Sequence, residues 1–240
     1  MAIQETRIER STTGTAMNSR LGKWLPLGAC LVLLLGGAAT VDAQVPQAAY
    51  PLIVDLVDTT GNYGDFILAG TAPPAPPSAG NPLCITLPYG EQYAYTPSIT
   101  TFDINDFQVD VEFMVNALPT TFHSPVIVGG NLWRFIGIVF DPTGTLGVLY
   151  NNSNSTFSST TIALGVWYHA QLRYEAGTVQ LYLDGTFIHD AVIGPLTNGG
   201  ASEFSITNYG MGRNLNGCIR NLTISNDSTV PVQLMSFRVE

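Results

Sequence analysis

The sequence is poor in charged residues, and in basic residues above all. Only 11% of its 240 residues are Asp, Glu, Lys or Arg. Beyond position 43 the chain has no Lys, and its five Arg stand against fifteen Asp and Glu, a net charge near −10. Nucleic acids and anionic membrane surfaces are usually bound by basic patches, so we expect neither as a partner. The acidic excess suits a cation-associated protein or, more simply, a soluble extracellular one.

The motifs that mark many enzymes are also missing. The chain has three His and three Cys, and none of them stands in a cluster with the spacing of zinc ligands. It contains no Gly-x-Ser-x-Gly sequence for a serine nucleophile and no phosphate-binding loop. His169 lies within a predicted strand, where a structural, partly buried role is the simpler interpretation. The sequence therefore favours a protein that binds over one that catalyses.

An apolar segment near the N-terminus predicts export. A short basic region precedes the segment 24–40, which is rich in Leu, Ala and Gly and too short for a comfortable membrane-spanning helix. The tripeptide 41–43, Val-Asp-Ala, then has residues permitted before a signal-peptidase site. We interpret residues 1–43 as a signal peptide cleaved after Ala43, with the true start at Met17, and expect a secreted protein without a membrane partner. A retained membrane anchor is the alternative.

The central stretch 165–185 predicts strands joined by tight turns. Its sequence is GVWYHAQLRYEAGTVQLYLDG, in which apolar and polar residues alternate over 168–174 and over 179–183. Successive side chains of a strand point to opposite faces, so each run has one apolar and one more polar face. Glu-Ala-Gly joins the two runs, and Asp-Gly turns the chain into a third short strand. We expect Trp167, at the start of this meander, to lie in the core.

Other runs show the same pattern. In the run 107–115 the Phe and Val residues at odd positions alternate with mostly polar residues, which predicts a half-buried strand. Clusters of Gly, Asn and Ser separate many short β-rich runs, as is typical of an all-β protein. We expect polar loops at 151–155 and 208–214. Further strands are expected at 126–128, 132–140, 146–150, 203–206 and 215–224.

Three segments carry a family resemblance. The Trp-Tyr-His opening of the central stretch and its Val-x-Leu-Tyr-Leu-Asp-Gly sequence resemble the centre of a laminin-G-like, or concanavalin A-like lectin/glucanase, domain. The turn DTTGNYGD at 58–65 and the Gly-Cys-Ile strand at 217–219 resemble its opening and its end. The resemblance implies an all-β jelly roll, a two-sheet antiparallel β-sandwich, over residues 44–226. Residues 227–240 would then form a terminal strand, at 232–237, or a loose tail.

Cys84 and Cys218 are predicted to form a disulfide. Secretion would place both in an oxidising compartment, which favours a bridge. In the jelly rolls that the chain resembles, the first and last strands are neighbours in one sheet, so the bridge would join adjacent strands. Laminin-G domains usually pair the Cys of the closing strand with a nearby one, and this chain offers Cys84 instead. Two buried free thiols are the alternative.

Asp110 and Glu112 form a carboxylate pair on the polar face of the strand 107–115. Glucanases with the jelly-roll fold carry Glu-x-Asp-x-x-Glu on one strand, with one carboxylate as nucleophile and another as acid/base. Here the third carboxylate is missing and the order of residues differs. We therefore do not expect an enzyme.

Calcium is the cofactor that the resemblance implies, because many laminin-G-like and lectin jelly rolls bind it at a loop rim. Calcium takes about six to eight oxygen ligands, which Asp, Asn and backbone carbonyls supply. The candidate ligands are Asp58, Asn62 and Asp65 in the first turn, and Asp141 beside the Asn-rich loop 151–154. The simpler alternative is that these residues form turns through local hydrogen bonds.

A sugar site needs an exposed aromatic ring with amide or charged groups beside it. The candidates in or next to loops are Trp133, Tyr150, Tyr209, Arg213 and Asn214. We predict a secreted, non-catalytic module that binds a polysaccharide or a surface glycan with calcium assistance. The alternative is an adhesive or structural module that binds an extracellular protein, and a glycan-degrading enzyme is the third.

Overall fold

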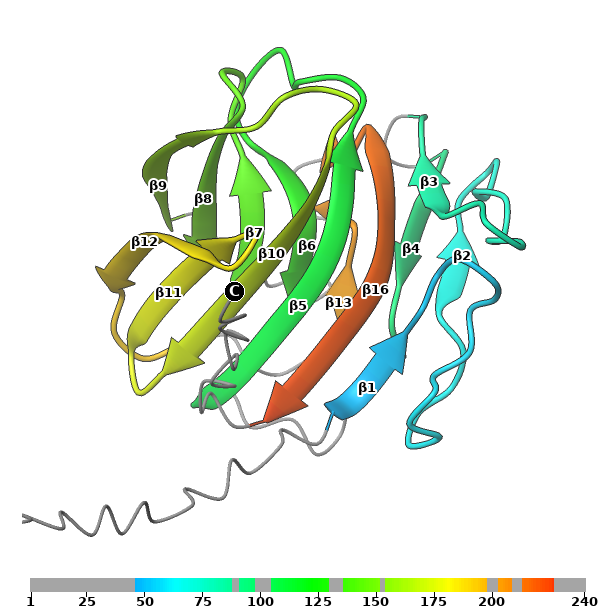
Figure 1. Ribbon diagram of the computed structural model, residues 1–240, viewed down its shortest axis with the longest axis horizontal. Helices are drawn as coiled ribbons and strands as arrows, with labels where there is room; N and C mark the ends of the chain where they lie inside the picture. Colours follow the sequence, from blue (N-terminus) through cyan, green and yellow to red (C-terminus); the bar gives the residue numbers. More distant parts are fainter. Residues whose placement is uncertain are drawn as a thin grey trace, which may run out of the picture. The chain divides into compact units, whose positions relative to one another are not determined.

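The computed structural model describes residues 46–87, 91–97, 105–129, 136–151, 154–197, 203–208 and 213–226, which are built of strands, turns and loops (Figure 1). Among these residues, no helix is long and apolar enough to cross a bilayer. All of the described residues belong to one unit, Val41–Glu240. The predicted signal peptide and the terminal strand predicted at 232–237 lie outside the described residues.

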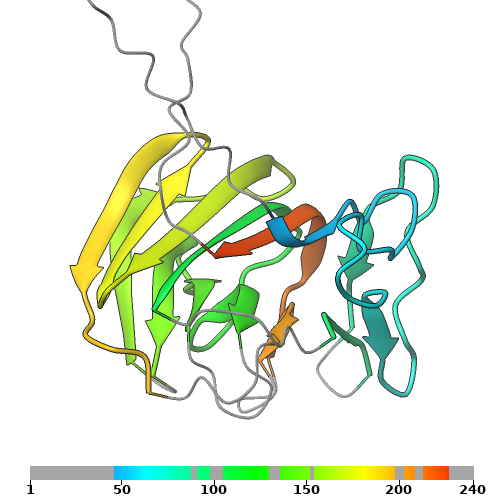
Figure 2. The same ribbon diagram turned by 90° about the horizontal axis from the view of Figure 1, so that it is seen from below.

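The described strands form two large antiparallel sheets, as predicted for a jelly-roll sandwich. The first sheet has the order β1 (Pro46–Tyr50), β16 (Gly217–Asn226), β5 (Asp106–Val115), β10 (Trp167–Glu175), β11 (Thr178–Leu183) and β12 (Thr186–Val192), and β3 (Leu83–Ile85) also pairs with β16. The second has the order β2 (Ile67–Ala69), β4 (Tyr93–Tyr95), β13 (Phe204–Ser205), β6 (Ser124–Gly129), β7 (Ile136–Phe140), β8 (Thr145–Tyr150) and β9 (Asn154–Thr161). Seen from below, β11 and β12 lie at one end and β1 and β2 at the other (Figure 2).

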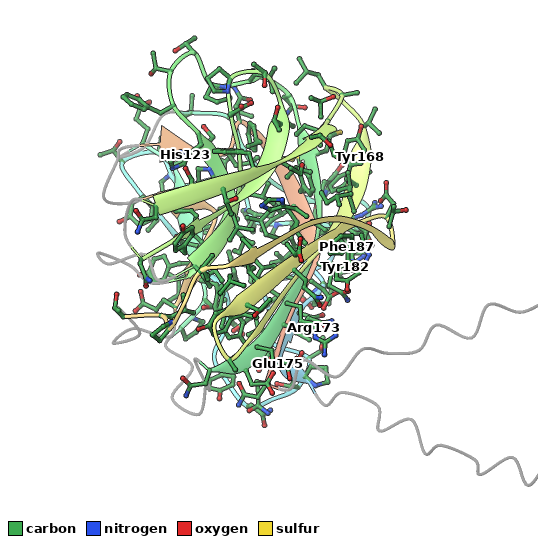
Figure 3. The ribbon with its side chains drawn as sticks, turned by 90° about the vertical axis from the view of Figure 1, so that its left-hand side faces the viewer. His123, Tyr168, Arg173, Glu175, Tyr182 and Phe187 are labelled. Atoms are coloured by element: carbon green, nitrogen blue, oxygen red, sulfur yellow. A yellow bond between two sulfur atoms is a disulfide. The ribbon has the colours of Figure 1, made fainter. Side chains whose placement is uncertain are left out.

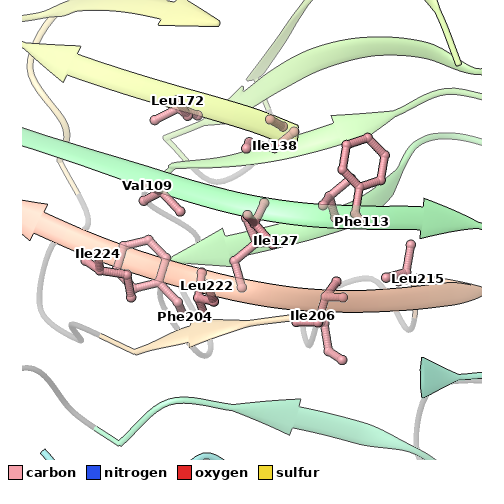
Figure 4. Close-up of a cluster of buried hydrophobic side chains, with 14 of the residues drawn as sticks. Val109, Phe113, Ile127, Ile138, Leu172, Phe204, Ile206, Leu215, Leu222 and Ile224 are labelled. Atoms are coloured by element: carbon pink, nitrogen blue, oxygen red, sulfur yellow. The ribbon is translucent and has the colours of Figure 1, made fainter. Parts of the chain in front are cut away.

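The core lies between the two sheets and is supplied by alternate residues of their strands. On β5 the predicted apolar face is confirmed, because Phe107, Val109, Val111, Phe113 and Val115 are all at most 2% exposed. Figure 4 shows side chains of both sheets meeting in this layer. Its labelled members include Val109, Phe113, Leu172 and Ile224 from the first sheet and Ile127, Ile138 and Phe204 from the second.

The central meander is confirmed as β10, β11 and β12, each antiparallel to the next. Ala170, Leu172 and Tyr174 are buried, as their alternation predicts. The core position expected for Trp167 is wrong. Trp167 has the same parity as His169, so it lies on the outward face of β10 and is half-buried. The alternation of the strand, rather than the size of the side chain, decides which face it occupies.

The predicted disulfide between Cys84 and Cys218 is confirmed. The two residues are direct register partners in the antiparallel pair of β3 and β16, so the bridge joins adjacent strands of the first sheet. It closes a sequence separation of 134 residues. Loops of this length are associated with a stabilisation of about 4–5 kcal/mol in the chain-entropy description.

Two predicted loops differ from the structure. The polar loop predicted at 151–155 is replaced from Asn154 onward by β9, an eight-residue strand at the edge of the second sheet. The loop predicted at 208–214 has paired ends, because β14 (Thr207–Asn208) and β15 (Arg213–Asn214) form a short antiparallel pair. Both segments are polar, so neither shows the apolar alternation that marks a half-buried strand.

Candidate functional site

The first sheet carries polar and aromatic side chains on the face that points away from the core. Figure 3 shows four of them, Arg173, Glu175, Tyr182 and Phe187, along one side of the molecule, away from His123. The register sets outward residues of neighbouring strands side by side, in rows that cross the sheet. In these rows Glu112 lies between Arg220 and His169, Gln171 between Asp110 and Tyr182, and Arg173 between Gln108 and Gln180.

Asp110 is the centre of a polar network on this face. Its carboxylate accepts hydrogen bonds from Gln108 Nε2 at 2.7 Å and from Gln171 Nε2 at 3.0 Å. The Nε2 atom of His169 lies 3.2 Å from Asp110 Oδ1. The hydrogen bond to Asp110 raises the pKa of His169 above its usual range, and the nearby charge of Glu112 raises it as well. Burial alone would lower this pKa, but its effect is outweighed. His169 therefore binds a proton more readily here than in the unfolded chain.

Glu112 is held in its ionised form. Burial by itself would raise its pKa, but hydrogen bonds from Asn221 and Arg220 outweigh burial and lower the pKa of Glu112 below its usual range. The Arg220 Nε and Asn221 Nδ2 atoms each lie 2.7 Å from its carboxylate. The Arg220 guanidinium also lies 4.2 Å from the centroid of the Trp167 ring. One face of that ring is thus covered by a cation–π contact.

The turn between β10 and β11 is fixed by backbone hydrogen bonds. Ala176 and Gly177 both have positive φ, 44° and 94°, so the turn uses the left-handed region that glycine adopts at little cost. The carbonyl of Gly177 accepts hydrogen bonds from Ile193 N at 2.9 Å and Gly194 N at 3.0 Å. Ala176 N donates to the carbonyl of Asn105 at 2.9 Å. The segments on both sides thus hold the turn in place.

A cavity of about 340 Å³ lies beside this turn and is lined by Arg173, Glu175, Ala176, Thr178 and Gln180. The Arg173 Nη2 atom is 3.5 Å from Glu175 Oε2, and the Arg173 side chain is 14% exposed. Its buried Nε atom has no hydrogen-bond partner among the described residues, and neither has the buried Oε1 atom of Gln108 on the facing strand. This end of the face therefore holds unused hydrogen-bonding capacity, which is rare for buried polar atoms.

An aromatic pair lies next to the cavity. The rings of Tyr182 and Phe187 are 5.6 Å apart between centroids and inclined at 71°, and Phe187 is 49% exposed. The Tyr182 hydroxyl donates to Gln180 Oε1 at 3.3 Å, which links the pair to a residue of the cavity. We name these six residues, Arg173, Glu175, Thr178, Gln180, Tyr182 and Phe187, the hairpin site.

The sugar-binding candidates chosen from the sequence do not gather at the hairpin site. Trp133, Tyr209 and the side chain of Arg213 lie outside what the structure describes. Tyr150 packs against the core. Asn214 Nδ2 donates to the carbonyls of Leu87 and Gln92 at 2.8 and 2.7 Å. Ligand binding by these residues stays a prediction. The hairpin site was missed because Arg173, Gln180 and Tyr182 were interpreted only as the polar face of the two strands. Glu175 was interpreted as part of the turn between them, and Phe187 as part of the third strand.

The first predicted calcium cluster is organised as a turn around Asp58. This carboxylate is 3% exposed and accepts hydrogen bonds from the backbone N–H groups of Ala49, Thr60, Asn62 and Tyr63, at 2.9–3.1 Å, and from the Thr60 hydroxyl at 2.7 Å. Burial would raise the pKa of Asp58, but these hydrogen bonds outweigh it and lower the pKa. Both carboxylate oxygens of Asp58 accept hydrogen bonds within the turn, and calcium binding by Asp58 stays a prediction.

The remaining calcium candidates lie in two different turns, Asn62 and Asp65 in the first turn and Asp141 in the turn before β8. Asn62 donates through Nδ2 to the Gln47 carbonyl at 3.1 Å, and Asp65 is exposed. Asp141 Oδ1 accepts hydrogen bonds from Thr143 and Thr145 in the turn before β8. Asp141 and Asn151 lie at opposite ends of β8, so the predicted contribution of the Asn-rich loop beside Asp141 is wrong. No group of three or more His, Cys, Asp or Glu side chains that could hold a metal ion occurs within the described ranges.

The sequence and the fold can now be compared with known proteins. Residues 88–233 match the sequence profile of the family described as the concanavalin A-like lectin/glucanases superfamily. The chain belongs to this superfamily. No curated protein matches the sequence at a significant level.

Solved structures of the superfamily's fold resemble the chain at low sequence identity. Domain 4 of AbnA, a GH43 extracellular arabinanase from Geobacillus stearothermophilus, in complex with arabinotriose, has a TM-score of 0.62 at 21% identity, over 79% of this chain and 96% of that one. Trypanosoma rangeli sialidase has a TM-score of 0.60 at 16% identity, over 76% and 30%. Botulinum neurotoxin type C has a TM-score of 0.56 at 13% identity, over 79% and 49%. These similarities show a shared fold.

The superfamily includes glucanases, so Asp110 and Glu112 must be considered as a catalytic carboxylate pair. A glycoside hydrolase needs a carboxylic acid whose pKa is raised, so that it can protonate the leaving group. Glu112 has a lowered pKa and is bound by Arg220 and Asn221. Asp110 already accepts two amide hydrogen bonds. Both carboxylates thus accept hydrogen bonds from side chains of the same sheet surface.

Proposed function

We propose that the chain is a secreted, non-catalytic module that binds a glycan at the hairpin site. The observation that carries this proposal is the half-exposed ring of Phe187, which leans on Tyr182 beside a cavity lined by hydrogen-bonding groups. A sugar ring offers an apolar face of C–H groups and a rim of hydroxyls. An aromatic surface next to charged and amide side chains meets both requirements.

Two neighbours of similar fold support a glycan as the ligand class. The arabinanase domain is described in complex with arabinotriose, and cell entry of the neurotoxin is described as dependent on two ganglioside molecules. Glu112 belongs to the carboxylate pair that resembles a glucanase site, and its hydrogen bonds to Arg220 and Asn221, with its lowered pKa, support a binding role over use as a general acid. The disulfide supports secretion, because such bonds persist in oxidising compartments.

A glycan array on residues 44–240, with calcium and with chelator, tests the proposal. We expect selective binding that Phe187→Ala weakens by about tenfold, which corresponds to about 1.4 kcal/mol. Leu164→Ala is the matched control, because Leu164 is 51% exposed and lies before β10, away from the hairpin site. If Phe187→Ala bound with unchanged affinity, the hairpin site would not be the glycan-binding site. Hydrolysis in a reducing-sugar assay would contradict the non-catalytic role.

An extracellular protein is the second candidate ligand. It is favoured by β12, which ends the first sheet and exposes Phe187 and also Val192, which is 86% exposed. The last strand of a sheet can pair with an extended segment of another chain. If a folded sample, checked by circular dichroism, bound no glycan on the array, we would assign the chain as a module that binds an extracellular protein.

A further inference from the structure

Negative charge surrounds the cavity of the hairpin site. The register places Asp106 opposite Glu175, Asp190 opposite Gln180 and Asp110 opposite Gln171. Residues that face each other across antiparallel strands project from the same side of the sheet. The carboxylates therefore lie in the three neighbouring rows of the outward face that hold the cavity and the aromatic pair.

The cations described on this face are already matched by carboxylates. Arg173, which lines the cavity, lies 3.5 Å from Glu175, and Arg220 lies 2.7 Å from Glu112. Even when His169 beside Asp110 is counted as a cation, the five outward carboxylates exceed the cations of this face in number; they are Asp106, Asp110, Glu112, Glu175 and Asp190. To pair with Arg173, a carboxylate or sulfate of the ligand would have to displace Glu175. It would also be repelled by the other carboxylates of the outward face, at a cavity that is partly shielded from water.

The hydrogen-bonding groups of the cavity suit hydroxyls. Arg173 can only donate and ionised Glu175 can only accept, while Thr178 and Gln180 can do both. A sugar hydroxyl donates one hydrogen bond and accepts others, so adjacent hydroxyls can accept from Arg173 and donate to Glu175 while the two side chains remain paired. A volume of about 340 Å³ is at the lower end of the range for ligand pockets and suits one end or one branch of a larger glycan.

We infer that the glycan bound at the hairpin site is uncharged, and that the Arg173–Glu175 cavity takes one of its hydroxyl-bearing sugar units. This inference rests on the proposed function and narrows it to neutral polysaccharides or oligosaccharides. Glycans that carry uronic acid, sialic acid or sulfate are excluded by the charge of the face. The Arg173 guanidinium serves as a hydrogen-bond donor to hydroxyl oxygens.

The first test is the composition of the bound set on an array that presents neutral and acidic glycans at equal density. We expect the bound glycans to be neutral, with an affinity that changes less than about twofold between about 0.05 and 0.5 M salt, because screening acts on charged ligands. Preferential binding of acidic glycans would overturn the inference and leave the proposed function standing. A blank array would overturn both.

The variant Glu175→Gln gives a second, independent test. It keeps the shape of the side chain and removes its charge. For a neutral glycan we expect affinity to fall by about fivefold, because hydrogen bonds to a charged acceptor are stronger than those to an amide. For an acidic glycan the same change would increase affinity, which would overturn the inference. Asp55→Asn is the matched control, because Asp55 is exposed and precedes β2, outside the hairpin site.

Discussion

The Nε2 atom of His169 lies 3.2 Å from Oδ1 of Asp110, across the antiparallel pair of β10 and β5. The two residues are diagonal neighbours on the outward face, since the direct partner of His169 is Glu112. His169 thus lies between the Asp110 network and the ion pair of Glu112 and Arg220, and the charge of Glu112 also raises its pKa.

The His169 contact predicts a pH dependence of folding stability. The pKa of His169 is raised in the folded protein, so its contribution is fully present below the unfolded pKa near 6.5 and is lost as the pH rises through the folded value. We expect His169→Gln to lower the urea midpoint of unfolding more at pH 5.5 than at pH 8.5. The difference should be small, because the His169 side chain is 43% exposed and solvent screens its charge. Equal losses at both pH values would contradict the prediction.

Asp58 is predicted to be the most important carboxylate for stability among those with lowered pKa values. Asp58→Ala leaves four backbone N–H groups without their acceptor, and we expect a loss of about 2–4 kcal/mol in urea unfolding. The control Asp65→Ala, at an exposed position of the same turn, should change stability by less than about 0.5 kcal/mol. Similar values for the two variants would show that the turn is not held by Asp58.

The Tyr182 hydroxyl and ring are predicted to have separable effects. Tyr182→Phe removes the hydrogen bond to Gln180 and keeps the ring against Phe187, so we expect a glycan affinity within about threefold of the unmodified protein. Tyr182→Ala removes the ring as well and should weaken binding by tenfold or more. Isothermal titration calorimetry with a ligand from the array measures both. An equal loss in the two variants would assign the effect to the hydroxyl alone.

Calcium binding stays a prediction, and the structure limits where it can occur. The Asp58 oxygens are occupied by hydrogen-bond donors, so we expect any calcium heat at millimolar concentration to depend on Asp65 or Asp141. Calorimetry of the double variant Asp65→Asn, Asp141→Asn should then show none. Absence of heat in the unmodified protein would contradict the prediction of calcium binding.

The disulfide is predicted to contribute strongly to stability. The double variant Cys84→Ser, Cys218→Ser should unfold with a free energy lower by about 2–5 kcal/mol, because the unfolded chain gains freedom when a long loop is opened. Urea unfolding with and without reductant provides the measurement. The variant should be insensitive to reductant, whereas the unmodified protein should approach it when reduced.

Periodicity made most of the fold predictable from the sequence. The Phe and Val residues of β5 and the apolar residues of β10 and β11 follow the period of two that strand geometry imposes, and their faces came out as predicted. The edge strand β9 was not predictable in this way. Its sequence, Asn-Ser-Thr-Phe-Ser-Ser-Thr-Thr, has no apolar alternation because little of it is buried.

The site was less predictable because it depends on register between strands. Arg173, Gln108 and Gln180 come from three strands and become neighbours only through pairing. Trp167 was expected in the core because of its place at the start of the central strand, yet Arg220, which is distant in sequence, covers one face of its ring on the outside. The sequence of a single strand predicts on which face of the sheet a residue lies. It does not predict which charged and aromatic side chains of other strands lie beside that residue.

The bond between Cys84 and Cys218 also affects how the protein would respond to proteases. A cut at any one position between these residues divides the polypeptide but leaves its two parts covalently joined. Such a nicked molecule would migrate as one species in a non-reducing gel and separate into two fragments after reduction. We expect the fold to survive cleavage of a loop, because the two linked parts stay at high effective concentration.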